Sequence, residues 1–275
     1  MEAMNPVDRF SDRVEDYVRY RPGYPRELLE PLRGDAALTS AAAVADIGCG
    51  PGNLAALFLE NGNTVFGVEP NAAMRAASEK AFDKLPRFHP IEGRAEATGL
   101  PSASVDFVVA GQAFHWFDLV PARIEFRRIL KPGGWVALVW NERAGASPFD
   151  HAYEAVLVEH GIDYRKIRDS RNDEPSILAF FEGAQVRRAT FTHSQLFDFD
   201  GLKGRLMSSS YAPRYGDPAH QPMLAHLRRV FDSHRNQGTV RFCYQTTMWF
   251  GRADNFLLTA MRPVASRDGS RRSGS

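Results

Sequence analysis

Ala45-Asp46-Ile47-Gly48-Cys49-Gly50-Pro51-Gly52-Asn53 is the stretch that decides the fold of this chain. It continues an apolar run at 41–45, and a helical pattern begins directly behind it with Leu54, Leu57 and Phe58. A buried strand, a tight glycine turn and a helix start, in this order, are typical of a ligand pocket in an α/β sheet. We therefore expect the main binding site at this turn.

The spacing of the glycines narrows the kind of ligand. Gly48, Gly50 and Gly52 form G-x-G-x-G, whereas the turn that holds a dinucleotide pyrophosphate has G-x-G-x-x-G. Asp46, at the end of the strand, repels a phosphate but suits a ligand with a positive group such as an ammonium. An NAD-linked oxidoreductase is therefore a weaker alternative, although the glycines would let any ligand approach bare backbone.

Strand and helix patterns alternate on both sides of this turn. The predicted strands are 43–46, 64–69, 87–92, 105–110 and 135–141. The predicted helices are 7–20, 26–32, 53–61, 71–82 and 121–130. Such alternation predicts a mostly parallel sheet with helices on both faces.

The pattern loosens after residue 141. Helices are predicted at 148–160, 175–180, 199–209 and 218–235. Strands are predicted at 185–199 and 239–251, the second because Val240, Phe242, Tyr244 and Thr246 alternate with other residues. The tail at 265–275 contains Ser, Gly and Arg without an apolar anchor, and we expect it to be disordered.

Composition excludes several classes of protein. The chain has 34 basic and 33 acidic residues, a net charge of +1, so no overall field favours nucleic acid or anionic lipid. Two cysteines do not make a disulfide framework, and His220, His226 and His234 lack metal-ligand spacing. Residues 1–20 have no apolar signal-peptide core, and no apolar run reaches membrane-spanning length. We expect a soluble cytoplasmic protein, a monomer or homodimer.

Four ordered motifs resemble those of the class I methyltransferases, which bind S-adenosylmethionine, and in particular the type 11 methyltransferase domain. The glycine turn resembles motif I, and 65–70 (VFGVEP) resembles the strand that ends in a ribose-binding acid. Segments 93–106 and 129–135 resemble those around the fourth strand and before the fifth. The resemblance implies a Rossmann-like fold: a seven-stranded, mostly parallel sheet with an antiparallel closing strand and a helical cap.

The same resemblance implies a set of cofactor contacts. They are Tyr17, Arg21, Asp46, Gly48, Cys49, Gly50, Gly52, Glu69, Pro70, Met74, Ala95, Glu96, Gly111 and Gln112. Glu69 would accept both ribose hydroxyls, and Asp46 would favour the ammonium. Pro70 and Met74 would enclose adenine, although Met74 could equally be a core residue. Many relatives carry Asp where Arg94 stands here, so the adenine amine is left with Glu96 or with no side-chain partner.

The segment Gly111-Gln112-Ala113-Phe114-His115-Trp116-Phe117 follows the fourth strand and resembles a group of small-molecule methyltransferases that includes relatives acting on trans-aconitate. It lacks the signature of amino-group methylation and an acid for Mg²⁺, so we expect no metal there. We assign the acceptor to Tyr24, Phe114, His115 and Trp116. His115 is the candidate catalytic residue, either as a general base or, as we favour, by orienting the acceptor.

The N-terminal segment resembles a lid in the same group. Arg21 would bind the methionine carboxylate and Tyr17 would lie near the sulfonium; the alternative is a surface helix that only stabilises the fold. We expect a lid at 1–34, a cofactor-binding core at 35–141 and a substrate-specific cap with a sheet strand at 142–238. A closing strand at 239–264 and the tail at 265–275 complete the chain.

The function that these expectations describe is metal-independent methyl transfer from S-adenosylmethionine to a small molecule. The alternative is a non-catalytic protein that binds S-adenosylmethionine or S-adenosylhomocysteine. The sequence leaves open whether an oxygen, nitrogen, sulfur or carbon atom is methylated, because the cap carries the choice of acceptor.

Overall fold

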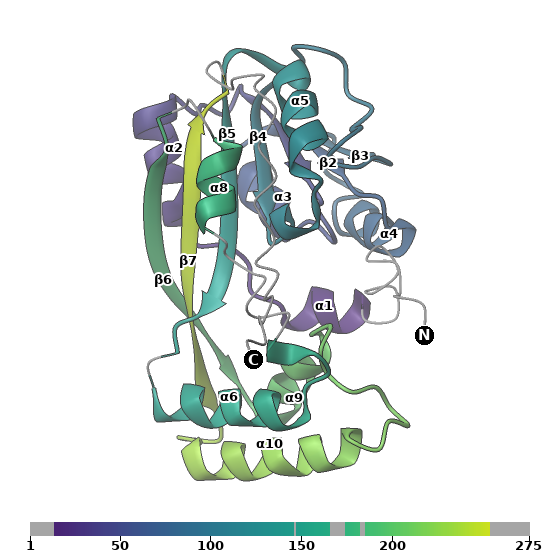
Figure 1. Cartoon of the computed structure of the whole chain (residues 1–275), viewed down its shortest axis with the longest axis vertical. Helices are drawn as coiled ribbons and strands as arrows, with labels where there is room; N and C mark the ends of the chain where they lie inside the picture. Colours follow the sequence, from purple (N-terminus) through teal and green to yellow (C-terminus); the bar gives the residue numbers. More distant parts are fainter. Residues whose placement is uncertain (1–13, 146, 166–173, 182–184, 254–275) are drawn as a thin grey trace, which may run out of the picture.

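One sheet organises the computed structural model of the chain, which describes residues 14–145, 147–165, 174–181 and 185–253. Within these residues seven strands form the order β3-β2-β1-β4-β5-β7-β6 (Figure 1). The strands are β1 (Ala43–Ile47), β2 (Thr64–Val68), β3 (Phe88–Ile91), β4 (Val105–Gly111), β5 (Leu130–Arg143), β6 (Arg187–Phe197) and β7 (Val240–Arg252). The first five are parallel, and β7 pairs antiparallel with both β5 and β6. The predicted sheet is thereby confirmed.

Helices connect the strands. The α-helices are α1 (Val14–Tyr20), α2 (Leu29–Ala36), α3 (Asn53–Glu60), α4 (Ala72–Ala81), α5 (Leu119–Ile129), α6 (Pro148–His160), α8 (Glu174–Phe180), α9 (Phe199–Met207) and α10 (His220–His234). Two short 3-10 helices are η2 (Arg26–Leu28) and η3 (Phe114–Trp116). The described part of the predicted helix 7–20 is α1, while 7–13 and the tail at 265–275 lie outside the described residues.

The strand order reverses between β1 and β4, which defines where a ligand can bind. Asp46 of β1 pairs with Gly67 of β2 on one side and with Val109 of β4 on the other. The carboxyl ends of these three neighbouring strands therefore meet at one edge of the sheet. A crevice at such a switch point is the usual ligand site of open α/β sheets.

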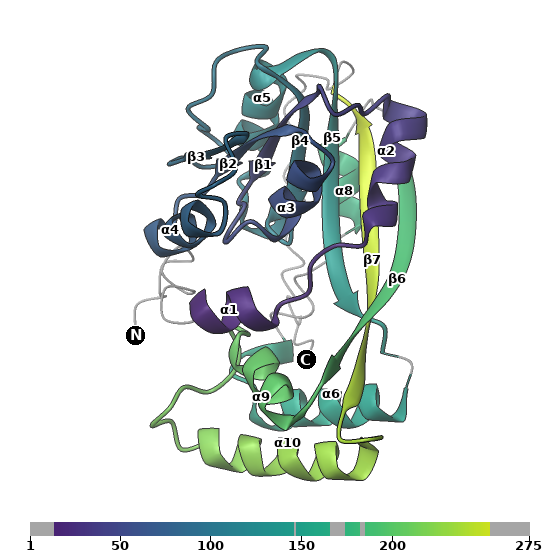
Figure 2. The ribbon, with the colours of Figure 1, turned by 180° about the vertical axis from the view of Figure 1, so that it is seen from behind.

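Two apolar cores fill the faces of the sheet. Helices α5 and α8 cover one face, where Phe126 and Phe180 are fully buried, and α2 and α3 cover the other, where Leu32 and Phe58 are fully buried (Figures 1 and 2). Helix α8 lies inside the range 142–238 that we expected to form the cap, yet it packs on the sheet. Its apolar residues at 177 and 180 face the core helix α5.

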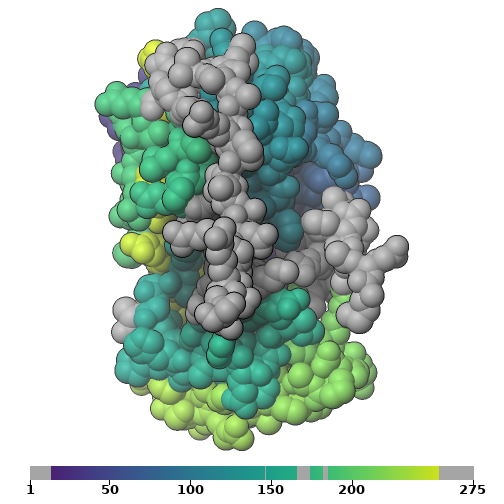
Figure 3. All heavy atoms as spheres, in the orientation of Figure 1, coloured from purple at the N-terminus to yellow at the C-terminus, as the bar shows by residue number. Residues whose placement is uncertain are grey.

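The cap has its own core, built on the ends of the longest strands. Strands β5, β6 and β7 continue past the two core faces to α6, α9 and α10 (Figures 1 and 2). The buried side chains of this cap core include Tyr153, Leu202, Leu227 and Phe242. The alternating residues of β7 predicted from the sequence are buried, as expected for one face of a strand. In the space-filling view α6 and α10 form the base of the molecule (Figure 3).

Helix α1 joins the cap to the core. It packs against α9, where a Cβ on Gly204 would lie 2.0 Å from the Tyr20 ring, and it also contacts α4. Only glycine at 204 lets the two helices approach this closely. Among the helices of the described residues, none is both long and apolar enough to span a bilayer.

Candidate functional site

The glycine turn between β1 and α3 leaves one backbone position bare. Gly48, Gly50 and Gly52 have φ of +67°, +56° and +95°. A Cβ on Gly52 would lie 2.3 Å from the Phe82 ring, so this glycine is required by packing. A Cβ on Gly50 would meet nothing within 4 Å, and its backbone borders the main cavity. Gly50 is therefore the point where a ligand can approach the backbone.

Glu69 directly follows β2 and is hydrogen-bonded to the glycine turn. Its Oε2 accepts the N–H of Gly50 at 2.8 Å, and its Oε1 accepts the N–H of Asn71 at 2.9 Å. Burial raises the pKa of Glu69, while the two hydrogen bonds and the nearby Arg75 oppose that shift. Each carboxylate oxygen keeps a further lone pair, so Glu69 can also accept hydroxyl groups from a ligand.

Asp46 lies beneath the turn and is completely buried. Burial raises the pKa of this carboxyl from 3.8 to about 8; the backbone N–H of Ala55 opposes the shift, and the charge on Glu69 adds to it. Neither carboxyl oxygen meets hydrogen-bond geometry with another described residue. Burial therefore favours the protonated form of Asp46, whereas a nearby cation would favour its ionised form.

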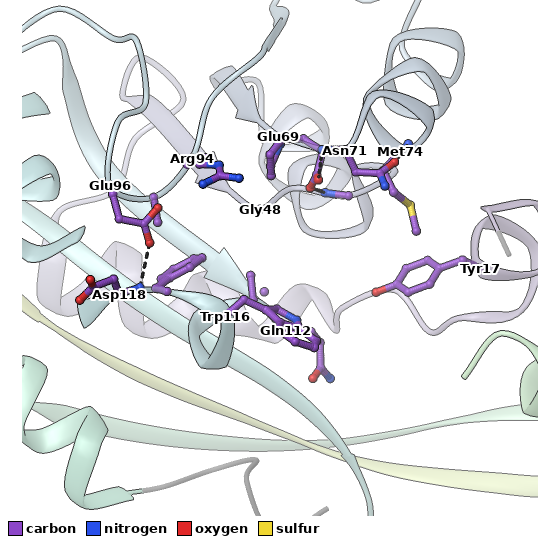
Figure 4. Close-up of a pocket in the computed structure, with 16 residues that line it drawn as sticks. Tyr17, Gly48, Glu69, Asn71, Met74, Arg94, Glu96, Gln112, Trp116 and Asp118 are labelled. Carbon is purple, nitrogen blue, oxygen red and sulfur yellow. Dashed lines mark hydrogen bonds between the residues drawn. The ribbon is translucent and has the colours of Figure 1, made fainter. Parts of the chain in front are cut away.

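A cavity of about 430 Å³ lies beside Glu69 and the glycine turn (Figure 4). Its walls are Tyr17, Gly48, Gly50, Glu69, Pro70, Asn71, Met74, Arg94, Ala95, Glu96, Gly111, Gln112, Ala113, Trp116, Phe117 and Asp118. This volume falls within the usual range for small-molecule sites, about 300–1,000 Å³. Eleven of the residues that we assigned to the cofactor or acceptor line this one cavity.

A tight turn after β3 forms another wall. The backbone groups of Arg94 and Ala97 bond to each other in both directions at 3.1 Å, which puts Ala95 and Glu96 at the tip. Glu96 Oε1 accepts the N–H of Asp118, the residue before α5, at 2.8 Å (Figure 4). One oxygen of Glu96 is thus engaged in holding the wall together, and the other is left for a ligand.

Four predicted cofactor residues do not line the cavity. They are Arg21, Asp46, Cys49 and Gly52. Arg21 turns toward the cap, where its Nε donates to Ser208 Oγ at 3.0 Å and a terminal nitrogen donates to the Ser208 carbonyl at 2.9 Å. Cys49 is buried within the turn, and burial raises the pKa of its thiol.

The residues predicted for the acceptor separate into different environments. Trp116 is 40% exposed and lines the cavity, while Phe114 is buried in the core beside α8. His115 is half-buried on η3, with its ring centroid 4.8 Å from that of Trp116, and it is not part of the cavity wall. Burial raises the pKa of Tyr24, whose hydroxyl would lie 2.5 Å from a Cβ on Gly111.

Five wall residues were missing from the sequence-based assignment. They are Asn71, Arg94, Ala113, Phe117 and Asp118. Asn71 caps α4 by accepting the N–H of Met74 at 2.9 Å, and an Asn just before a predicted helix is a known capping signal. Arg94 points toward the cavity (Figure 4), a position that its sequence context alone did not indicate.

Comparison with known proteins agrees with this geometry. Residues 45–138 match the sequence model of a family described as "Methyltransferase domain". A methyltransferase of Schizosaccharomyces pombe is 32% identical over 205 residues, which cover 73% of this chain and 77% of that protein. A methyltransferase of Mycobacterium tuberculosis is 39% identical over 134 residues, 49% of this chain; the match spans about half of that relative, 52%.

A solved structure extends the likeness to three dimensions. It is of a type II methyltransferase from Anaeromyxobacter dehalogenans, 26% identical, with a TM-score of 0.63 over 85% of this chain and 98% of the other. The match therefore includes segments outside the residues of the family model.

Proposed function

The chain belongs to the class I S-adenosylmethionine-dependent methyltransferases, and on that premise we propose that it transfers a methyl group to a small organic acceptor by in-line displacement. One observation carries the proposal. The carboxyl ends of β1, β2 and β4 bring Gly50, Glu69 and Gly111 to the wall of a single cavity. Bound S-adenosylmethionine supplies a methyl group that its sulfonium has already activated.

The residues of the cavity suit this cofactor. Glu69 is a buried carboxylate with lone pairs to spare for two hydroxyls, and Gly50 leaves room for a ligand against its backbone. The buried carboxyl of Asp46 lies under the same turn and would favour a ligand ammonium. Cavity walls from Tyr17 and Trp116 would exclude water and hold the acceptor in line, which is the main catalytic requirement.

The experiment is methyl transfer from cofactor labelled in its methyl group to a panel of small acceptors. Labelled product with the natural chain, and its loss in Glu69→Gln, would support the proposal. A non-catalytic binding protein would bind S-adenosylhomocysteine but transfer label to no acceptor. Tight binding of NAD in place of S-adenosylhomocysteine would overturn the proposed function altogether.

We further infer that the acceptor carries a carboxylate, because of Arg205 in the cap. Arg205 is 7% exposed; its Nε donates to Tyr244 Oη at 3.1 Å and a terminal nitrogen to Ser209 Oγ at 3.4 Å. Within the described residues no carboxylate pairs with it. A buried charge without an opposite charge is costly, and an acceptor carboxylate would offset that cost.

Arg205 does not line the cavity itself, but side-chain contacts link it to a residue that does. Ser209 Oγ also accepts from Arg21 at 3.4 Å, and the Arg21 guanidinium lies 5.0 Å from the centroid of the Tyr17 ring, which lines the cavity. Small di- and tricarboxylates are therefore the first acceptors to test, each beside its amide. Equal kcat/KM for acids and amides would contradict this assignment.

A variant tests whether Arg205 recognises the charge of the acceptor or only stabilises the fold. Arg205→Met should raise KM for acid acceptors at least about tenfold, since a hydrogen bond to a charged group contributes about 1.5–3 kcal/mol. Arg205→Lys should recover part of the loss, and circular dichroism should confirm that both variants are folded. Affinity for S-adenosylhomocysteine should stay within about twofold, because Arg205 does not line the cavity.

A further inference from the structure

Two histidines and a glutamate converge between α6 and α10, on the cap. Glu159 and His160 are the last two residues of α6, and His226 lies in the second turn of α10. His226 Nδ1 is 3.3 Å from His160 Nε2 and 3.1 Å from Glu159 Oε2; His160 Nε2 is 3.5 Å from Glu159 Oε1. Residues 66 positions apart thus present their ligand atoms to one point.

The three residues form a triangle in which the separations between polar atoms are close to those between neighbouring ligands of a zinc ion. Metal–nitrogen and metal–oxygen bonds of about 2.0–2.1 Å at tetrahedral angles put neighbouring ligand atoms about 3.3–3.4 Å apart. The two histidine nitrogens are 3.3 Å apart, and they lie 3.1 and 3.5 Å from different oxygens of Glu159, Oε2 and Oε1, so each pairwise separation is close to that value. The imidazole planes are nearly perpendicular, at 84°, so the rings do not stack and both nitrogens can face a shared ion.

The ligands stand on well-packed helices. Val156 and Leu157 of α6, together with Met223 and Leu227 of α10, are buried in the cap core and hold the two helices together. The two histidine side chains are 12% and 19% exposed, while that of Glu159 is 61% exposed. A cation here would be bound by the three side chains on its protein-facing side. Its fourth coordination position would face solvent and could hold a water molecule.

We propose that Glu159, His160 and His226 form a binding site for a divalent transition-metal ion, with Zn²⁺ the best fit. Two imidazoles and one carboxylate favour Zn²⁺, Cu²⁺ or Ni²⁺ over Mg²⁺ and Ca²⁺, which prefer oxygen ligands. The ion would tie the end of α6 to α10 and so stabilise the cap. It is separate from the cavity of the methyl transfer, whose wall includes none of the three residues.

The test uses the full chain without an affinity tag, treated with a chelator and titrated with Zn²⁺ by calorimetry. We expect one ion per chain and a higher melting temperature with Zn²⁺. His226→Ala should weaken binding at least about 100-fold, more than the loss of an outer-shell partner costs. Glu159→Gln should weaken it less, because both imidazoles remain. His151→Ala is the matched control, an exposed histidine on α6 outside the triangle, and should bind like the natural chain.

A second measurement fixes the geometry. Co²⁺ in place of Zn²⁺ should give an intense visible absorption typical of four-coordinate cobalt, which disappears in His226→Ala and in the milder variant His160→Gln. Melting curves without metal show whether these variants are folded. Failure of the natural chain to bind Zn²⁺ would overturn the proposal. So would equal binding by His226→Ala, because the ion would then lie elsewhere.

Discussion

Glu69 is organised before any ligand is present. Its two oxygens accept N–H groups from Gly50 and Asn71, so the carboxylate is fixed in orientation and its remaining lone pairs face the cavity. A ligand that uses this group loses little side-chain entropy on binding. The same two bonds hold the glycine turn against the start of α4.

Replacing Glu69 tests this organisation. Glu69→Gln keeps the size of the side chain but removes one strong acceptor, so affinity for S-adenosylhomocysteine should fall by about 1.5–3 kcal/mol. Calorimetry measures the change. Glu60→Gln, at the exposed end of α3, is the control and should bind normally. Normal binding by Glu69→Gln as well would exclude Glu69 from the site.

Titration of Asp46 should lower the free energy of unfolding as the pH rises. The folded state keeps this proton up to about pH 8, whereas the unfolded chain releases it near 3.8. Between these values the folded state binds more protons, so the contribution of Asp46 to the free energy of unfolding decreases with rising pH. The loss is complete above the folded pKa.

Urea unfolding at pH 5, 7 and 9 measures this effect. Asp46→Asn carries no titrating proton, so its stability relative to the natural chain should improve from pH 5 to pH 7 and level off toward pH 9. The test compares how the free energy of unfolding of each protein changes with pH. A pH-independent cost of burying the amide therefore does not affect the result. Parallel pH profiles for the two proteins would show that Asp46 does not hold its proton in the folded state.

His115 does not line the cavity itself, but it can affect the acceptor by positioning Trp116, which does. It stands between buried Phe114 and cavity-lining Trp116, with its ring against that of Trp116. His115→Gln should therefore raise KM for the acceptor several-fold and change kcat little, as expected for a positioning residue. Steady-state kinetics decide the point. A fall in kcat of about 100-fold, with loss of a limb in the pH–rate profile, would identify a general base instead.

At the scale of elements, the contact between α1 and α9 depends on a glycine. Gly204→Ala would put a methyl group 2.0 Å from the Tyr20 ring and displace α1, whose Tyr17 lines the cavity. Overpacking of this kind costs about 1–3 kcal/mol. We expect a lower melting temperature together with weaker S-adenosylhomocysteine binding.

Gly34→Ala is the matched control for that variant. Gly34 lies inside α2, and a Cβ there meets nothing within 4 Å. Alanine at this position should leave binding unchanged and increase stability by up to about 1 kcal/mol through helix propensity. If Gly204→Ala behaves in the same way as this control, α1 does not depend on close packing with α9.

For the whole molecule, three continuous strands connect core and cap. β6 and β7 contribute side chains to the apolar cores of both parts, and β5 reaches the cap through Arg143, which pairs with Glu154 of α6, so neither part can lose its strands without disturbing the other. Urea should therefore unfold the chain in one transition. Fluorescence of Trp135, Trp140 and Trp249 reports the core, and far-ultraviolet circular dichroism includes the cap helices; the two curves should coincide. A loss of helix that precedes the change in fluorescence would contradict a single unit.

Local sequence patterns predicted the secondary structure and the sheet. Contacts between residues far apart in the chain could not be predicted from these patterns. The turn at 45–53 was predictable because glycine, acid and apolar residues report on adjacent backbone. The contact of Arg21 with Ser208 was not, since the two residues are 187 positions apart. Glu96 and Asp118 meet across a shorter separation of 22 positions, and the 66 positions between His160 and His226 concealed their convergence.

The attachment of α1 to the cap affects how a ligand in the cavity exchanges with solvent. One side of this helix covers the cavity through Tyr17, while Tyr20 and Arg21 fasten it to α9 of the cap. A ligand in the cavity is therefore screened on this side by a helix whose position depends on the cap. We expect S-adenosylhomocysteine to dissociate faster from Gly204→Ala, in which this attachment is displaced, than from the natural chain.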